Sequence, residues 1–520
     1  DTIGNFVDAL TEVDSIYIGD NPSDTTSSAL GNVSLGVSAL EDITTGDYNV
    51  AIGYLAGANL TTASRVTIVG QAAGQSQTTE NNNTFLGERA GHNSNGGQDV
   101  TFVGALAGYN NDGSDNVMIG QGAGQSSNSQ YQSVFIGTEA GFGAASSGFG
   151  NVALGYRSFA LSTSGYYNTA IGQEAGYNLS SGRNNTLIGF RSGYALTTTS
   201  HNIFIGEEAG RYATSAEQNT GMGYHALGEG TLTGNENVAI GQQSMADATS
   251  ATKNVAIGQK TLEKITVGES NVAIGHHALS DNAMGDENIA IGASALSSLD
   301  AASDGDGENT AVGYSSGTDM TTGEKNTLFG HQTGHGIESG DKNVVIGAQA
   351  GGSMSATASN NTFLGYKAGD TSTGGDGNVM LGYEAGPSSA NTSSNTLYIN
   401  NAAGTPLIGG DFSAGTVTID GDIYTNSLGQ GLRFAGRDDL LIRGTASYDM
   451  EITAPQDMAF GIDSDNNETA HKFLFKTNTK TPSTAGTTLM SILETGKVGI
   501  GTDAPNNTLE VAGVIRGTNY

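Results

Sequence analysis

A glycine recurs about every 17 residues along most of this chain, twenty-two times between Gly19 and Gly382. Most intervals are seventeen residues, one is 16, three are 18 and one is 21. A fixed period of this length is typical of a solenoid, in which each repeat is one structural unit that stacks on the next. The sequence therefore predicts an all-β fold, a β-solenoid or β-roll of about 22 rungs.

Each of these glycines ends a short cassette, Asn-[Val/Thr]-x-[Ile/Leu]-Gly, whose complete form Asn-Val-Ala-Ile-Gly occurs at 49–53, 237–241, 254–258 and 271–275. The alternation of Val50 and Ile52, or of Val272 and Ile274, has the period of two that is typical of a strand with one buried face, and we interpret Val and Ile as that face. The glycine predicts a sharp turn in a conformation closed to residues with a Cβ. The positions that we expect to fix the repeat are Gly53, Gly87, Gly120, Gly172, Gly241, Gly258, Gly275, Gly347, Asn49, Asn237, Asn254 and Asn271.

Three other positions of the repeat are restricted. The cassette opens with Asn in eighteen of twenty-two cases, and stacked Asn side chains hydrogen-bond along a solenoid as a ladder; a carbohydrate-binding row is the alternative. Ala, Ser or Thr follows three residues after the glycine in all twenty-one later cassettes, which indicates a close approach of two backbones. The next position is Gly in fourteen and Leu, Met or Phe in seven. Five of these seven fall between Leu227 and Leu296, which predicts a segment with a thicker core.

Composition argues against a large globular core. The 520 residues include 79 Gly and no Trp, and only 36% are hydrophobic, which suits a thin core of one or two side chains per layer. Proline supports the boundaries, since the chain has none between Pro22 and Pro387 and proline interrupts a strand ladder. We therefore expect a lead-in at 1–14, a solenoid shaft at 15–386 and a β-rich C-terminal module at 387–520. Within this module, strands are expected at 396–399, 416–419, 440–442 and 472–475, and a turn-and-strand unit at 498–511.

Fifty-two acidic and twenty basic residues give a net charge of −32. This balance disfavours nucleic acid as a partner, because phosphate binding needs clustered Lys and Arg. It indicates a solvated, self-repelling surface, with divalent-cation binding as the alternative. No stretch approaches the roughly 20 apolar residues that span a bilayer, so no membrane insertion is expected. The chain opens without Met or a signal peptide, and we expect it to be part of a longer product.

The cassette Asn-Val-Ala-Ile-Gly-x-x-Ala-Gly resembles the head repeats of trimeric autotransporter adhesins over about residues 15–386. The resemblance implies a left-handed parallel β-roll in a homotrimer, although the period here is longer. The segment Val-Gly-Ile-Gly-Thr-Asp-Ala-Pro-Asn-Asn-Thr-Leu-Glu-Val-Ala-Gly at 498–513 resembles a segment common in bacteriophage tail fibres. There it often precedes a self-cleaving chaperone that trimerises the fibre, which here would be expected after Tyr520.

Motifs for catalysis or metal binding are weak. The string Gly313-Tyr314-Ser315-Ser316-Gly317 matches a nucleophile elbow, but its glycines and Ser316 fill standard repeat positions. We interpret the pairs His276-His277 and His331/His335 as surface residues, with a metal on a trimer axis as the alternative. Two acidic loops, 304–308 and 463–467, resemble fragments of calcium sites but lack the bidentate Glu. We expect no catalytic, metal or cofactor site, with calcium as the alternative cofactor.

Tyrosine directly follows the repeat glycine six times, at Tyr54, Tyr156, Tyr224, Tyr314, Tyr366 and Tyr383. We interpret this row as packing between protomers or rungs, with sugar stacking as the alternative.

These observations predict a non-enzymatic structural and adhesive protein, a homotrimeric phage tail fibre of the virion that contacts a host surface glycan or protein receptor. The alternatives are a bacterial surface adhesin or extracellular filament subunit, and a polysaccharide-degrading tailspike.

Overall fold

The computed structural model describes residues 9–12, 14–19, 28–143, 147–300, 307–372, 374–421, 472–477, 487–493 and 495–514. These residues form strands, turns and irregular segments, and no helix among them could cross a membrane. Contacts divide the chain into two compact units, Asp1–Ile423 and Tyr424–Tyr520.

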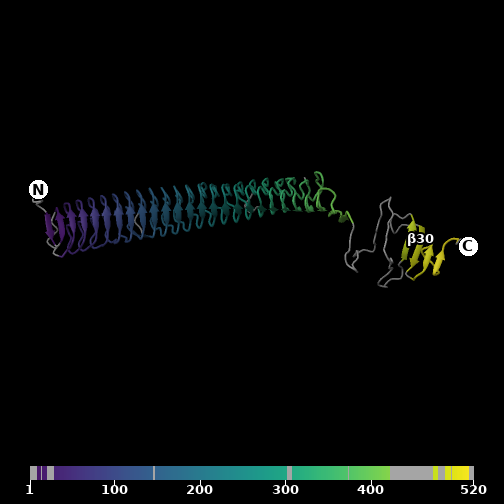
Figure 1. Cartoon of the computed structure of the whole chain (residues 1–520), viewed down its shortest axis with the longest axis horizontal. Coiled ribbons are helices and arrows are strands. Elements are labelled where there is room, and N and C mark those ends of the chain that lie inside the picture. Colours follow the sequence, from purple (N-terminus) through teal and green to yellow (C-terminus); the bar gives the residue numbers. More distant parts are fainter. Residues whose placement is uncertain are drawn as a thin grey trace. The chain divides into compact units, whose positions relative to one another are not determined.

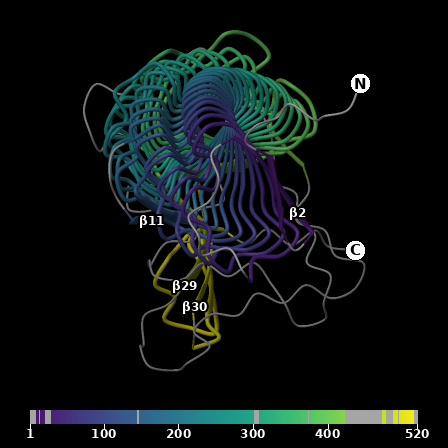
Figure 2. The same cartoon turned by 90° about the vertical axis from the view of Figure 1, so that its left-hand side faces the viewer.

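The first unit is a β-solenoid, as the glycine period predicts. It has about 21 turns of a roughly 17-residue repeat. One short strand per turn pairs in parallel with the strand of the next turn. Equivalent residues are paired in register, so that Val255 pairs with Val272 and Ile257 pairs with Ile274. The strands follow one another in chain order along the unit (Figure 1), and successive turns superpose with a gradual rotation when viewed along it (Figure 2).

The parallel ladder consists of β2 (Ser15–Ile18), β3 (Val33–Leu35), β4 (Val50–Ile52), β5 (Thr67–Val69), β6 (Thr84–Leu86), β7 (Thr101–Val103), β8 (Val117–Ile119), β10 (Val134–Ile136), β12 (Val152–Leu154), β13 (Thr169–Ile171), β14 (Thr186–Ile188), β15 (Ile203–Ile205), β16 (Thr220–Met222), β17 (Val238–Ile240), β18 (Val255–Ile257), β19 (Val272–Ile274), β20 (Ile289–Ile291), β21 (Thr310–Val312), β22 (Thr327–Phe329), β23 (Val344–Ile346), β24 (Thr362–Leu364), β25 (Val379–Leu381) and β26 (Thr396–Ile399).

Antiparallel strands cover both ends of this ladder. At the start, β1 (Ala9–Glu12) pairs antiparallel with β2. At the other end, β27 (Ile408–Asp411) pairs antiparallel with β26, and β28 (Thr416–Ile419) pairs with β27. Open strand edges invite pairing with other chains, so these additions protect the ladder from end-to-end growth. The sheet therefore continues past residue 386, and the predicted strands at 396–399 and 416–419 are confirmed.

The described residues of the second unit include a small four-stranded sheet. β29 (Lys472–Thr477) pairs antiparallel with β30 (Thr487–Leu493), which pairs antiparallel with β31 (Val498–Ile500). The last pair, β31 with β32 (Leu509–Val511), is parallel. The strands predicted at 472–475 and in the unit 498–511 are confirmed, whereas 440–442 lies outside the described residues.

The repeat glycines form the corners of the solenoid. Gly258 has a φ of +136° and Gly275 a φ of +128°, values that residues with a Cβ rarely adopt. Each corner also lies directly on the next, because a Cβ added to Gly275 would lie 2.7 Å from the carbonyl oxygen of Gly292. Both the backbone conformation and the stacking distance therefore require glycine, as the sequence predicts.

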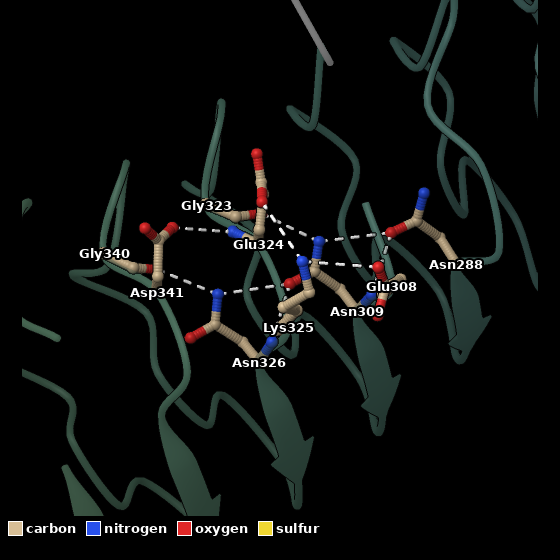
Figure 3. A network of polar contacts seen from close by, with 9 residues as sticks. All are labelled: Asn288, Glu308, Asn309, Gly323, Glu324, Lys325, Asn326, Gly340 and Asp341. Atoms are coloured by element: carbon tan, nitrogen blue, oxygen red, sulfur yellow. Dashed lines mark hydrogen bonds and ion pairs between the residues drawn. The ribbon is translucent and has the colours of Figure 1, made fainter. Parts of the chain in front are cut away.

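The opening asparagines form a buried ladder. The backbone N–H of Asn271 donates to Oδ1 of Asn254 at 2.9 Å, and its Nδ2 donates to the same oxygen at 3.0 Å. The Nδ2 also donates to the carbonyl of Gly285 at 2.8 Å. Figure 3 shows the same pattern at Asn309 and Asn326. The predicted internal role of these amides is confirmed, since buried polar groups need such partners.

Turns without the asparagine supply an oxygen from elsewhere. Oγ of Ser15 accepts a hydrogen bond from the backbone N–H of Asn32, and Oγ of Ser133 accepts one from the backbone N–H of Asn151. Beside the Val66 turn, Nδ2 of Asn83 donates to Oε1 of buried Gln77 at 2.7 Å. The ladder therefore tolerates interruptions where a neighbouring side chain satisfies the amide.

The solenoid core lies under the central residue of each strand. In every ladder strand from β2 to β25 this residue is buried, and the two residues that flank it are not. In the complete cassettes the buried residue is Ala, so Ala256 faces the core while Val255 and Ile257 face outward. The interpretation that Val and Ile form the buried face is wrong. Leu262 and Ile265 of the same turn are fully buried, so little core volume is left beside Ala256, and the larger strand residues lie on the other face of the sheet.

The central residue shares its space with the position four residues after the glycine. In all seven turns where that position is Leu, Met or Phe, the central residue is Ser, Ala or Gly. In eleven of the fourteen turns with Gly there, the central residue is Ile, Leu, Val, Met or Phe. A Cβ added to Gly91 would lie 2.5 Å from the Phe85 ring of the same turn. In the segment from Leu227 to Leu296 the large residue therefore stands four residues after the glycine, and a small residue stands at the centre of the strand. The thicker core predicted there is wrong.

The three remaining turns are small at both positions. Their central residues are Ala51, Ala170 and Ala311. In the turn before each of them the large residue stands four residues after the glycine, and in the turn after it the large residue is the central residue of the strand. A Cβ added to Gly176, in the Ala170 turn, would lie 2.8 Å from Leu187 and 3.9 Å from Phe159 of the two neighbouring turns. Leu179 of the same turn is also fully buried, so the core at this turn is filled partly by its own side chain and partly by those of its neighbours.

We expect Gly275→Ala to open the turns around it. The change combines an unfavourable positive φ, which costs about 1–3 kcal/mol, with a clash against Gly292. Hydrogen exchange should accelerate in residues 254–292, because solenoid turns depend on their neighbours. Gly404→Ala is the control, since Gly404 has a φ of +120° but no atom closer than 3.8 Å to an added Cβ. Equal effects of the two changes would show that the stacking contact contributes nothing.

In the turn of β16 we expect that either the central residue or the position four residues after the glycine can supply the large core residue. Leu227→Gly alone should cost about 2–5 kcal/mol through a cavity, and Gly221→Leu alone should overpack the core. The double variant should recover most of the loss, because it reproduces the Leu187/Gly193 arrangement beside Phe204. Thermal unfolding of the three variants measures the coupling, and additive losses would contradict it.

Candidate functional site

Two outer surfaces of the solenoid are candidates for function, and neither contains the positions predicted to fix the repeat. The predicted glycines form corners, and the predicted asparagines are buried in the ladder. Both sets therefore act on the fold, and any recognition depends on the side chains that the turns carry outward.

The first surface is the apolar stripe, formed by the two residues that flank the central residue in each ladder strand from β2 to β25. The leading residue is always Val, Ile or Thr, and the trailing residue is always Ile, Leu, Val, Met or Phe. None of them is buried; Ile257 is 37% exposed and Phe329 is 56% exposed. The stripe follows the parallel ladder without a charged residue.

This stripe is larger than an isolated soluble protein normally exposes. The largest apolar patch on a typical monomer measures about 300–600 Å² and is often functional. The stripe continues through twenty-two successive strands. Exposed apolar area of this extent is typical of a surface that another chain covers.

The second surface is a groove of about 570 Å³ lined by Tyr166, Tyr167, Arg183, Asn184 and His201. These residues come from three successive turns, and they lie just before the opening asparagines of β13, β14 and β15. Nδ2 of Asn184 contacts Nε2 of His201 at 3.3 Å. The groove therefore combines two aromatic rings with hydrogen-bonding groups of three kinds.

A second small sheet supports this region. β9 (Ser129–Tyr131) pairs in parallel with β11 (Ser147–Phe149), and single bridges extend the pairing from Phe149 to Tyr166 and from Tyr166 to Arg183. The pairing places aromatic residues of consecutive turns next to one another, and the rings of Phe149 and Tyr167 meet edge to face at 5.5 Å.

The six tyrosines that follow the repeat glycine lie on the outer surface, each 42–55% exposed. The rings of Tyr366 and Tyr383 stack at 5.5 Å, and Tyr314 stacks on His331 of the next turn at 5.4 Å. Packing between rungs is thus confirmed for these pairs.

The string 313–317 follows the geometry of the repeat. Gly313 and Gly317 have φ values of +139° and +61°, like their counterparts in other turns, and Ser316 is buried. Its Oγ donates to the carbonyl of Leu328. The motif match therefore follows from the cassette.

The histidine pairs are separate from one another. The rings of His276 and His277 lie 4.2 Å apart, and burial, helped by the charge of His276, lowers the pKa of His277. His335 lies 2.9 Å from the carboxylate of Asp319. Within the described ranges, no three His, Asp or Glu side chains gather in a metal-binding group. Residues 304–306 and 463–467 of the proposed calcium loops lie outside the described residues.

Sequence reasoning missed both outer surfaces. The stripe has a sequence signal, since no charge ever occupies the positions that flank the central residue. The groove has one too, because aligning the turns places Tyr131, Phe149 and Tyr166 in one column. Reading the repeat by columns would have found them.

Comparison of the sequence with models of known protein families and with curated proteins gave no match.

Proposed function

We propose that the chain is a structural and adhesive fibre protein, a homotrimeric phage tail fibre whose shaft carries contacts to the host cell surface. The observation that supports this proposal most is the apolar stripe, which runs through every ladder strand from β2 to β25. A long rod with one continuous apolar face needs a partner of matching length.

A second copy of the chain meets this requirement best. The stripe repeats with the spacing of parallel strands, about 4.8 Å per turn. A partner that packs against it over about 100 Å must repeat with the same spacing. Identical copies provide this match, and symmetric self-association is the usual form of soluble oligomers. Three copies, rather than two, follow from the resemblance to trimeric adhesin heads.

The other properties of the chain suit an extended fibre. The capped ends of the ladder favour an assembly of defined length over open growth. The net charge of −32 keeps assembled rods apart at high local concentration. Three copies multiply weak receptor contacts through avidity. A bacterial surface adhesin with the same shaft is the alternative.

We expect the chain to elute as a trimer of three 52.8 kDa protomers, about 158 kDa, in light scattering. Paired changes Ile257→Lys and Ile274→Lys should shift the mass toward one protomer, because charges cannot be buried in an apolar interface without a partner. The labelled trimer should also adsorb to cells in a panel of bacterial strains, and the lysine variant should lose adsorption with its avidity.

The double variant Ser250→Lys and Ser270→Lys is the matched control, since it adds the same two charges at exposed positions of the same region. It should keep both the trimer mass and adsorption. A single protomer mass for the unchanged chain would contradict the assembly, and a trimer that adsorbs to no strain would contradict the adhesive role.

A further inference from the structure

One column of the solenoid changes character at the groove. The column is the second residue before the opening position of each strand. It carries Tyr131, Phe149 and Tyr166 in three consecutive turns. Every other position of this column between Asp47 and Asp376 is polar, charged or Gly. A turn can therefore form without an aromatic residue there, so the cluster needs a reason other than the fold.

The aromatic side chains of this cluster are open to solvent. Tyr166 is 38% exposed and Tyr167 is 58% exposed, and both line the groove. The ring of Tyr167 lies over Gly150, where an added Cβ would be 2.9 Å from its Cδ1. Phe149 contacts the same ring edge to face. Tyr167 is thus held in place from below while its outer face remains accessible.

The charge around the groove differs from that of the rest of the chain. Residues 116–206 contain three Arg and only two Glu, whereas the whole chain carries 52 acidic and 20 basic residues. Both glutamates are paired, Glu139 with Arg157 and Glu174 with Arg191. The guanidinium of Arg183 has no carboxylate within ion-pair distance among the described residues. This part of the shaft therefore accepts an anion that the rest of the surface repels.

We propose that this groove binds an anionic saccharide, one that carries carboxylate or phosphate groups. The faces of Tyr166 and Tyr167 stack on the apolar C–H face of a sugar ring. Arg183 donates to the anionic group, for which its planar fork is suited. Asn184 and His201 hydrogen-bond sugar hydroxyls at the side of the groove. This inference rests on the proposed adhesive function, and it names the ligand class and the position on the shaft.

The test uses the full chain and three defined probes, which are oligogalacturonate, a mannose-6-phosphate oligosaccharide and neutral maltohexaose. Calorimetry should show binding of at least one anionic probe, about tenfold or more tighter than maltohexaose. The double change Tyr166→Ala and Tyr167→Ala should weaken that binding about tenfold or more, as loss of aromatic anchors does. Arg183→Gln should remove the preference for the anionic probe and keep the weak binding of the neutral one.

Tyr48→Ala is the matched control. Tyr48 occupies the same position as Tyr167 in another turn, is also 58% exposed and likewise lies over a glycine, Gly31. Its neighbour in the column is Asp47. The control should leave binding unchanged. Binding of no probe, equal binding of all three, or an equal loss in Tyr48→Ala would overturn the proposal that the groove binds an anionic saccharide.

Light scattering on the same samples separates this inference from the proposed function. A trimer that binds no saccharide contradicts the saccharide site alone, whereas a single protomer mass contradicts the proposed trimer. If Tyr166→Ala and Tyr167→Ala instead reduce the mass, the rings contact a second copy of the chain, and the saccharide site is wrong.

Discussion

The stacking of one glycine corner directly on the next is the contact on which the solenoid depends. At Gly275 an added Cβ would meet the carbonyl of the following corner, so the distance between turns at this edge is set by two backbones alone. Strand pairing and the asparagine ladder require this same spacing, because both join equivalent atoms of adjacent turns. A side chain at the corner would separate all three sets of contacts together.

Fixed spacing at the corner also explains how the core varies. Since the turns cannot move apart, the space shared by the central strand residue and the position four residues after the glycine holds at most one large side chain per turn, and the sequence chooses which of these two positions supplies it. Leu262 does so beside Ala256, and Phe85 does so beside Gly91. The small turns at Ala51, Ala170 and Ala311 mark the places where this choice changes.

The repeat period, the glycine corners and the asparagine ladder could all be predicted from the sequence, because each depends on residues that the backbone geometry excludes or requires at one position. The buried face could not. Val255 and Ile257 are the more hydrophobic residues of their strand, and the alternation alone does not say which face meets the core. Which face is buried depends on the core volume that is left, and Leu262, four residues after the glycine, already occupies it.

The groove was missed for a different reason. Its residues lie far apart along the chain, and stacking brings Tyr166, Arg183 and His201 of successive turns together. Such a site has no local motif, and only the comparison of equivalent positions between turns distinguishes it from the polar background.

The exchange of large side chains within the core has a consequence for how the shaft changes its length. In the turns from Leu227 to Leu296 the large core residue stands four residues after the glycine each time, and every turn has the glycine corner and the opening asparagine. Duplication or loss of one whole turn there would preserve the stacking of the glycine corners, the asparagine ladder and both end caps. The reach of the rod could therefore lengthen or shorten by steps of about 4.8 Å, with the groove at Tyr166 left intact.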